Sequence, residues 1–61
     1  MEQFIEVTQG KKKVTINIFY ITMFREKIDI NTGCKSVISF VDGNKLEVTD
    51  DYETLKSLIL R

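Results

Sequence analysis

Four apolar residues of the segment 36–49 stand at even positions on either side of an Asp-Gly turn, and this parity constrains the fold more than any other feature. They are Ile38, Phe40, Leu46 and Val48. Cross-strand partners share one face of a sheet, so the loop between these two strands must contain an odd number of residues. A three-residue loop at 41–43 places Gly43 at the left-handed position of a G1 bulge, where glycine has no Cβ penalty. The parity therefore predicts a hairpin of strands 34–41 and 44–49.

The same rule predicts a second hairpin near the N-terminus, formed by strands 3–8 and 12–18. Matching Val7 with Val14 leaves Gly10–Lys11 as a two-residue loop. Glycine at the first position of such a loop is what a type II′ turn requires.

The middle of the chain predicts a third strand over 22–30, where apolar and charged residues alternate. A turn cluster follows at 31–33, and a three-residue loop there would pair Phe24 with Phe40. Alternation breaks over 18–22, which predicts a bend or a short helical turn between the second and third strands.

Acidic residues then introduce an amphipathic helix, predicted over 51–60. Asp50 and Glu53 stand at capping-box spacing, and acidic residues favour the positive end of the helix dipole, so we expect Asp50 to be the cap. Apolar residues follow at helical spacing: Tyr52, Leu55, Leu58 and Ile59. Ten residues are marginal for an isolated helix in water, so this helix must dock on the sheet.

Together these elements predict one domain over 1–61 of the α+β class, mainly β. Its expected architecture is an antiparallel five-stranded meander, or a small barrel, with one C-terminal helix. The expected core consists of Ile5, Val7, Val14, Ile16, Phe24, Ile38, Phe40, Leu46, Val48, Leu55 and Ile59. A chain of 61 residues buries only about 60% of its unfolded surface. One cysteine excludes an internal disulfide. Tight strand pairing and oligomerisation are therefore the remaining ways to stabilise so small a core.

The inventory of reactive side chains argues against an enzyme. The sequence has no histidine, which removes the usual general base, and it has too few thiols and imidazoles for a zinc site. Cys34 is expected to act as a small buried hydrophobe. We therefore predict no catalytic residues, no metal site and no cofactor.

A surplus of apolar side chains predicts a protein interface. Phe19, Ile21 and Met23 lie on or near a sheet face that one short helix cannot cover, and exposed apolar patches usually mark contacts with a partner. The expected function is a non-enzymatic protein-interaction or regulatory module, whose partner is another protein or a second copy in a two-fold dimer. The competing outcome is a closed monomeric barrel in which these three side chains turn inward.

A run of three lysines supports an alternative function. Lys11, Lys12 and Lys13 could line a basic hairpin edge that contacts nucleic-acid phosphates. Nine basic and nine acidic residues cancel, however, so no net field attracts a polyanion. Lysines also protect edge strands against aggregation, and we favour that interpretation.

The chain carries no pattern of a secretory signal and no apolar run near the roughly 20 residues that span a bilayer. The single unpaired Cys34 suits a reducing compartment. A cytoplasmic location is therefore expected.

Seven segments follow a recurring order of short strands, turns and a closing helix: Phe4–Thr8, Gly10–Lys12, Val14–Ile18, Val37–Phe40, Asp42–Gly43, Leu46–Val48 and Tyr52–Ile59. In this order they resemble small bacterial and phage proteins of the FlbD/SwrD flagellar type. The segment 27–36 departs from that pattern. The resemblance implies a small cytoplasmic protein without known catalytic residues, of the kind that bacteria, phages and mobile elements encode, and its flagellar role is not carried over.

Overall fold

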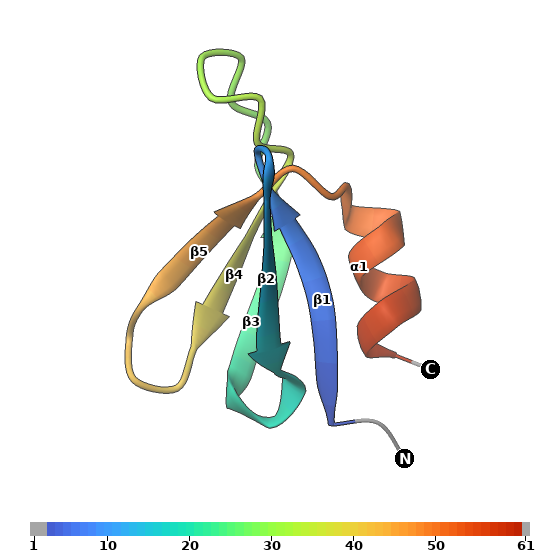
Figure 1. Ribbon diagram of the computed structural model, residues 1–61. Coiled ribbons are helices and arrows are strands. Elements are labelled where there is room, and N and C mark those ends of the chain that lie inside the picture. Colours follow the sequence, from blue (N-terminus) through green and yellow to red (C-terminus); the bar gives the residue numbers. More distant parts are fainter. Residues whose placement is uncertain (1–2, 61) are drawn as a thin grey trace.

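The computed structural model describes residues 3–60, and within them the chain forms five strands and one α-helix (Figure 1). In chain order the elements are β1 (Phe4–Gln9), β2 (Lys12–Asn17), the 3₁₀ helix η1 (Ile18–Tyr20), β3 (Ile21–Glu26), β4 (Ser36–Phe40), β5 (Lys45–Val48) and α1 (Tyr52–Ile59). The predictions of a mainly β chain with one C-terminal helix, and of a short helical turn after the second strand, are confirmed.

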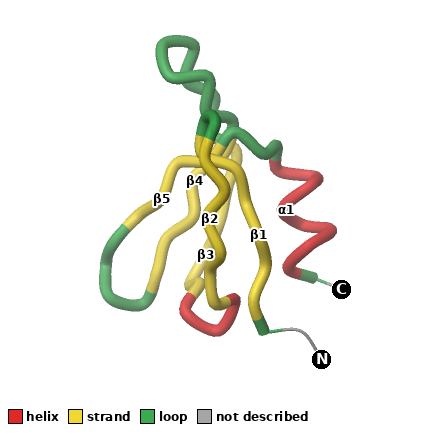
Figure 2. Tube along the Cα trace, in the orientation of Figure 1, coloured by secondary structure: helices red, strands yellow, loops and turns green. Residues whose placement is uncertain are grey.

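The strands form two sheets, and the expected single five-stranded meander is wrong. One sheet has the order β1-β2 and the other β3-β4-β5, all antiparallel. The chain leaves the first sheet at Asn17, whose side-chain Oδ1 accepts a hydrogen bond from the Phe19 N–H at 2.9 Å and starts η1. This cap turns the chain away from β2 before β3 begins. Figure 2 shows the turn as a short helical segment between two strands.

The first hairpin has the predicted register. Val7 lies opposite Val14, and Gly10 has a φ of 64°. Lys11 has no positive φ, which excludes a type I′ turn and leaves type II′.

The second hairpin also has the predicted register and loop. Ile38 lies opposite Leu46, and the Phe40 N–H donates to the Asn44 carbonyl at 2.9 Å, which closes the three-residue loop. Gly43 has a φ of 90°, as a G1 bulge requires. Parity together with the glycine positions was therefore sufficient to predict both hairpins.

The predicted pairing of β3 with β4 is wrong by two residues. Phe24 lies opposite Ile38 rather than Phe40, and β3 ends at Glu26 rather than at residue 30. A shift of two residues keeps every side chain on its expected face, so Phe24 still faces the core.

The strand ends early because local hydrogen bonds close a longer loop at 27–35. The Asp29 carbonyl accepts from the Gly33 N–H at 2.9 Å, and Asp29 Oδ1 accepts from the Asn31 N–H at 2.9 Å. The first is a backbone turn and the second an Asx turn, and both compete with strand pairing. Ile28 and Ile30, expected in the strand, are exposed in this loop, which projects beyond the strands in Figure 1.

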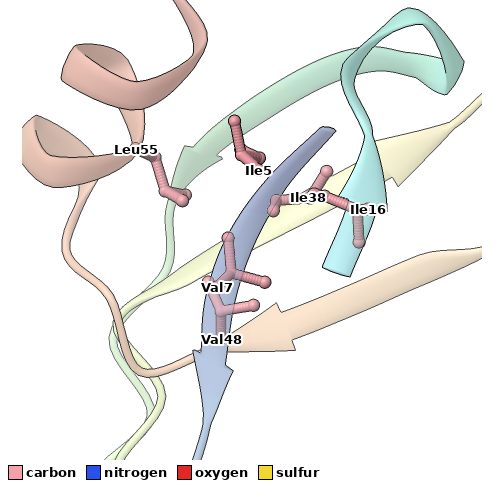
Figure 3. Close-up of a cluster of buried hydrophobic side chains, with 6 residues drawn as sticks. All are labelled: Ile5, Val7, Ile16, Ile38, Val48 and Leu55. Carbon is pink, nitrogen blue, oxygen red and sulfur yellow. The ribbon is translucent and has the colours of Figure 1, made fainter. Parts of the chain in front are cut away.

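The core lies between the two sheets and α1 (Figure 3). Its buried side chains form one cluster: Ile5, Val7, Ile16, Ile38, Val48 and Leu55. The other five predicted core residues pack against this cluster and are partly buried: Val14, Phe24, Phe40, Leu46 and Ile59. Leu55 is fully buried and points from α1 into this cluster on the side of β1, so the helix closes one side of the space between the sheets.

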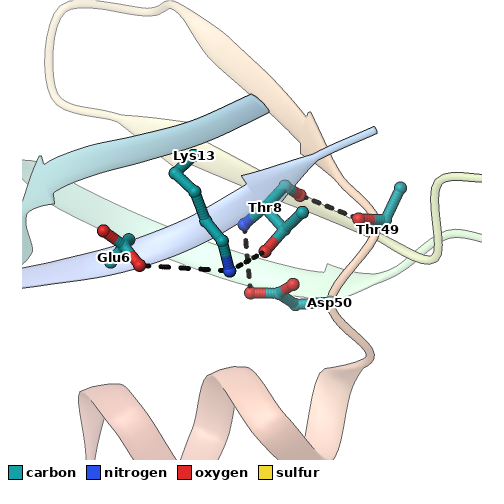
Figure 4. A network of polar contacts seen from close by, with 5 residues as sticks. All are labelled: Glu6, Thr8, Lys13, Thr49 and Asp50. Carbon is teal, nitrogen blue, oxygen red and sulfur yellow. Dashed lines mark hydrogen bonds and ion pairs between the residues drawn. The ribbon is translucent and has the colours of Figure 1, made fainter. Parts of the chain in front are cut away.

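The two sheets meet at one corner, which we call the seam. Thr49 donates its backbone N–H at 2.8 Å and its hydroxyl at 3.0 Å to the Thr8 carbonyl, and the Thr8 N–H donates to Asp50 Oδ2 at 3.3 Å (Figure 4). Asp50 therefore accepts a hydrogen bond from β1. The prediction that Asp50 caps the helix is wrong.

The helix cap is Asp51 instead, and the helix runs over Tyr52–Ile59 rather than 51–60. Asp51 Oδ1 accepts from the Thr54 N–H at 2.8 Å, which satisfies one of the free donors of the first turn. Glu53 adds negative charge near the positive end of the helix.

Asp51→Asn is expected to flatten the acid-induced loss of helix. Hydrogen bonds from the Thr54 side chain and backbone lower the pKa of the Asp51 carboxyl below its usual value of 3.8, and the Lys35 charge acts in the same direction. Because the folded-state pKa is the lower one, this stabilisation is present above about pH 4 and is lost as the pH falls through the folded-state pKa. Asparagine keeps a capping oxygen and does not titrate. Circular dichroism at 222 nm across the acid range measures the difference.

The control for this experiment is Asp51→Ala, which removes the cap at every pH and should lower the helix signal throughout. An acid transition in Asp51→Asn as steep as that of the wild type would contradict the assignment of Asp51 as the titrating cap.

Candidate functional site

Large exposed apolar side chains gather at the end of the molecule where η1 lies. Phe19 is 64% exposed and Tyr20 59%. Val41, in the loop between β4 and β5, is 62% exposed, and its N–H donates to the Tyr20 carbonyl at 2.8 Å. Met23 lies on β3 opposite Ser39 of β4, and its side chain is 50% exposed. We call the set Phe19, Tyr20, Met23 and Val41 the apolar end.

Two of the three predicted interface residues belong to the apolar end. Phe19 and Met23 are exposed, whereas Ile21 lies opposite Phe40 and packs against the core. The register shift between Ile21 and Met23 explains this, because the irregularity turns these two side chains to opposite faces.

Sequence reasoning missed Tyr20 and Val41 as members of the surface. The break in alternation included Tyr20 and was a usable signal. Val41 carried no signal, because its place beside Tyr20 depends on a hydrogen bond between segments 21 residues apart.

The three lysines lie together around the tip of the β1–β2 hairpin, and all are exposed. The Lys13 Nζ lies 3.4 Å from Thr8 Oγ1 and 4.0 Å from Glu6 Oε1 (Figure 4). Such exposed pairs contribute little energy. The local acid nevertheless reduces the positive charge that this tip presents to a phosphate.

The nucleophilic side chains of the β4 region are shielded. Cys34 is 7% exposed, and Ser36 is fully buried. Within residues 3–60, no group of three or more His, Cys, Asp or Glu side chains is placed to hold a metal ion. Within the same range no helix has the length and apolar character to cross a membrane.

No family model, no curated protein and no solved structure matches this chain. The resemblance to the FlbD/SwrD type therefore rests on the sequence patterns alone. The geometry of the apolar end carries the functional argument.

Proposed function

We propose that this protein is a non-enzymatic protein-interaction module that pairs with a second copy of itself through the apolar end. The observation that carries the proposal is the gathering of four large apolar side chains, each at least half exposed, at one end of a small molecule. Monomeric proteins rarely expose a patch of this kind without a partner. A core this thin also gains stability from a second copy.

The composition of the apolar end suits an interface core. Aromatic residues and methionine are enriched in such cores, and charged residues are depleted. The residues that flank Met23 across and along the strands, Thr22 and Ser39, are uncharged. A chain with no net charge also meets no net repulsion from its own copy.

We place this module in the reducing cytoplasm, because its single cysteine, Cys34, is a buried free thiol. The resemblance to the FlbD/SwrD type supports the same class of small protein without catalytic residues.

The double variant Phe19→Ser with Val41→Ser is expected to dissociate the pair. Wild-type protein at micromolar concentration should sediment at twice the 7.1 kDa protomer mass, and the variant at the protomer mass. Removing one buried aromatic anchor from an interface costs about 2 kcal/mol or more, which is roughly a 30-fold rise in Kd. Analytical ultracentrifugation over a concentration series measures both.

The matched control is Ile30→Ser, which removes an apolar side chain that is 93% exposed in the loop at 27–35. It should sediment like the wild type. A wild-type monomer at all concentrations, or dissociation by Ile30→Ser alone, would contradict the proposed interface.

Duplex DNA binding that weakens steeply with salt and is lost in Lys11→Ser with Lys12→Ser would support the nucleic-acid alternative instead.

A further inference from the structure

A groove of about 570 Å³ lies between β3 and the first turn of α1, toward the end of β3 that is remote from η1. Its lining residues are Phe24, Arg25, Glu26, Asp51, Tyr52 and Glu53. None of them belongs to the apolar end.

One wall of the groove is a free sheet edge. β3 is the outer strand of its sheet. The Phe40 N–H donates to the Asn44 carbonyl, so Phe40 directs its backbone groups toward β5. This direction alternates along an antiparallel strand, so Val37 directs its backbone groups toward β3. Arg25 lies opposite Val37, and Phe24 and Glu26 on either side of it therefore direct their backbone N–H and C=O groups away from β4. These groups form a template that an added strand can pair with.

The two walls together supply aromatic surface and negative charge, from β3 and from the start of α1. The rings of Phe24 and Tyr52 lie 5.5 Å apart between centroids at an angle of 32°. Three of the lining residues are acidic, Glu26, Asp51 and Glu53, against the single base Arg25. Lys35 acts on Asp51 from outside the groove and offsets part of this charge. An excess of carboxylates beside two half-buried aromatic rings favours a cationic side chain.

We propose that this groove binds an extended peptide segment that carries a lysine or arginine and adds to β3 as a further strand. Main-chain hydrogen bonds to Phe24 and Glu26 supply the docking, and the cation lies against the carboxylates and the rings. A segment of about three to five residues spans the free edge, because a strand rises about 3.3 Å per residue. The groove is a second binding site and does not depend on self-association at the apolar end.

The test uses synthetic pentapeptides and the full chain. Acetyl-Lys-Val-Lys-Val-Lys-amide should shift the backbone amide resonances of Phe24 and Glu26 in ¹⁵N spectra, and acetyl-Glu-Val-Glu-Val-Glu-amide should not. A version of the basic peptide with alternate N-methylated amides keeps the charge and loses the donors, so it should bind at least about three-fold more weakly if a strand is added. Raising the salt concentration should weaken binding of the basic peptide to the wild type.

Variants locate the site. Glu26→Gln with Glu53→Gln should raise the Kd of the basic peptide about three- to ten-fold, the range expected for losing two exposed ion pairs. The control is Glu6→Gln, an acidic residue on the β1–β2 hairpin, which should leave the Kd unchanged. The Phe19→Ser, Val41→Ser variant should bind the peptide like the wild type. This variant therefore distinguishes a failure of the proposed dimer from a failure of the proposed peptide site.

Three results would overturn the proposal. They are shifts that map to the apolar end instead of β3, equal binding of the acidic peptide, and equal binding of the N-methylated peptide. If the double glutamine variant does not fold, the salt series and the N-methylated peptide decide the question on the wild-type protein.

Discussion

Ile38→Ala is expected to remove a large share of the free energy of unfolding at 25 °C. Ile38 is fully buried and lies between Phe24 on β3 and Leu46 on β5. Truncating a buried isoleucine to alanine costs about 2–5 kcal/mol, from lost burial and from the cavity left behind. A chain of this length has a total free energy of unfolding of about 3–9 kcal/mol. The substitution therefore removes a large share of the stability, and urea denaturation followed by circular dichroism measures that share.

Ile30→Ala makes the identical chemical change at a side chain that is 93% exposed. Its expected effect on the free energy of unfolding is within about 0.5 kcal/mol. If the two variants lost the same stability, Ile38 would not lie in a closed core, and the β3-β4-β5 sheet would be wrong.

Leu55→Ala is expected to release α1 from the sheets. Leu55 is the fully buried contact of the helix with the core, and its truncation costs about 2–5 kcal/mol. An eight-residue helix is too short to persist in water without this contact. The helical circular dichroism signal should therefore fall, and the amides of 52–59 should exchange hydrogen much faster than in the wild type.

Leu60→Ala is the matched control, because Leu60 follows the same helix and is 63% exposed. It should change neither the helix signal nor the exchange rates appreciably. Retention of slow exchange over 52–59 in Leu55→Ala would show that other contacts hold the helix, and the assigned role of Leu55 would be wrong.

The two hairpins were predictable because short-range parity and turn chemistry agree there. Gly10 and Gly43 stand where each turn needs a positive φ, and the apolar residues of the paired strands then share one face. Parity has a limit, however, that the third strand exposes. A register error of two residues leaves every side chain on the same face, so the pattern could not distinguish Phe40 from Ile38 as the partner of Phe24.

The helix cap shows a second limit of local patterns. Two adjacent aspartates, Asp50 and Asp51, both stand where a cap is plausible, and capping-box spacing favoured the first. The decisive contact is the bond from Thr8 to Asp50, between residues 42 positions apart in the chain. The same holds for the candidate site, where Phe19 and Met23 could be predicted and Val41 could not.

The seam has a consequence for the rate at which the protein folds. Each strand ladder in the described chain joins strands that are consecutive in sequence, and isolated hairpins form within about 1–10 μs. The bonds between Thr8 and Thr49, by contrast, join residues 41 positions apart, and their loop-closure entropy is lost before any contact compensates it. We therefore expect the closure of the seam at Thr49, through one backbone and one side-chain hydrogen bond, to limit the rate of folding.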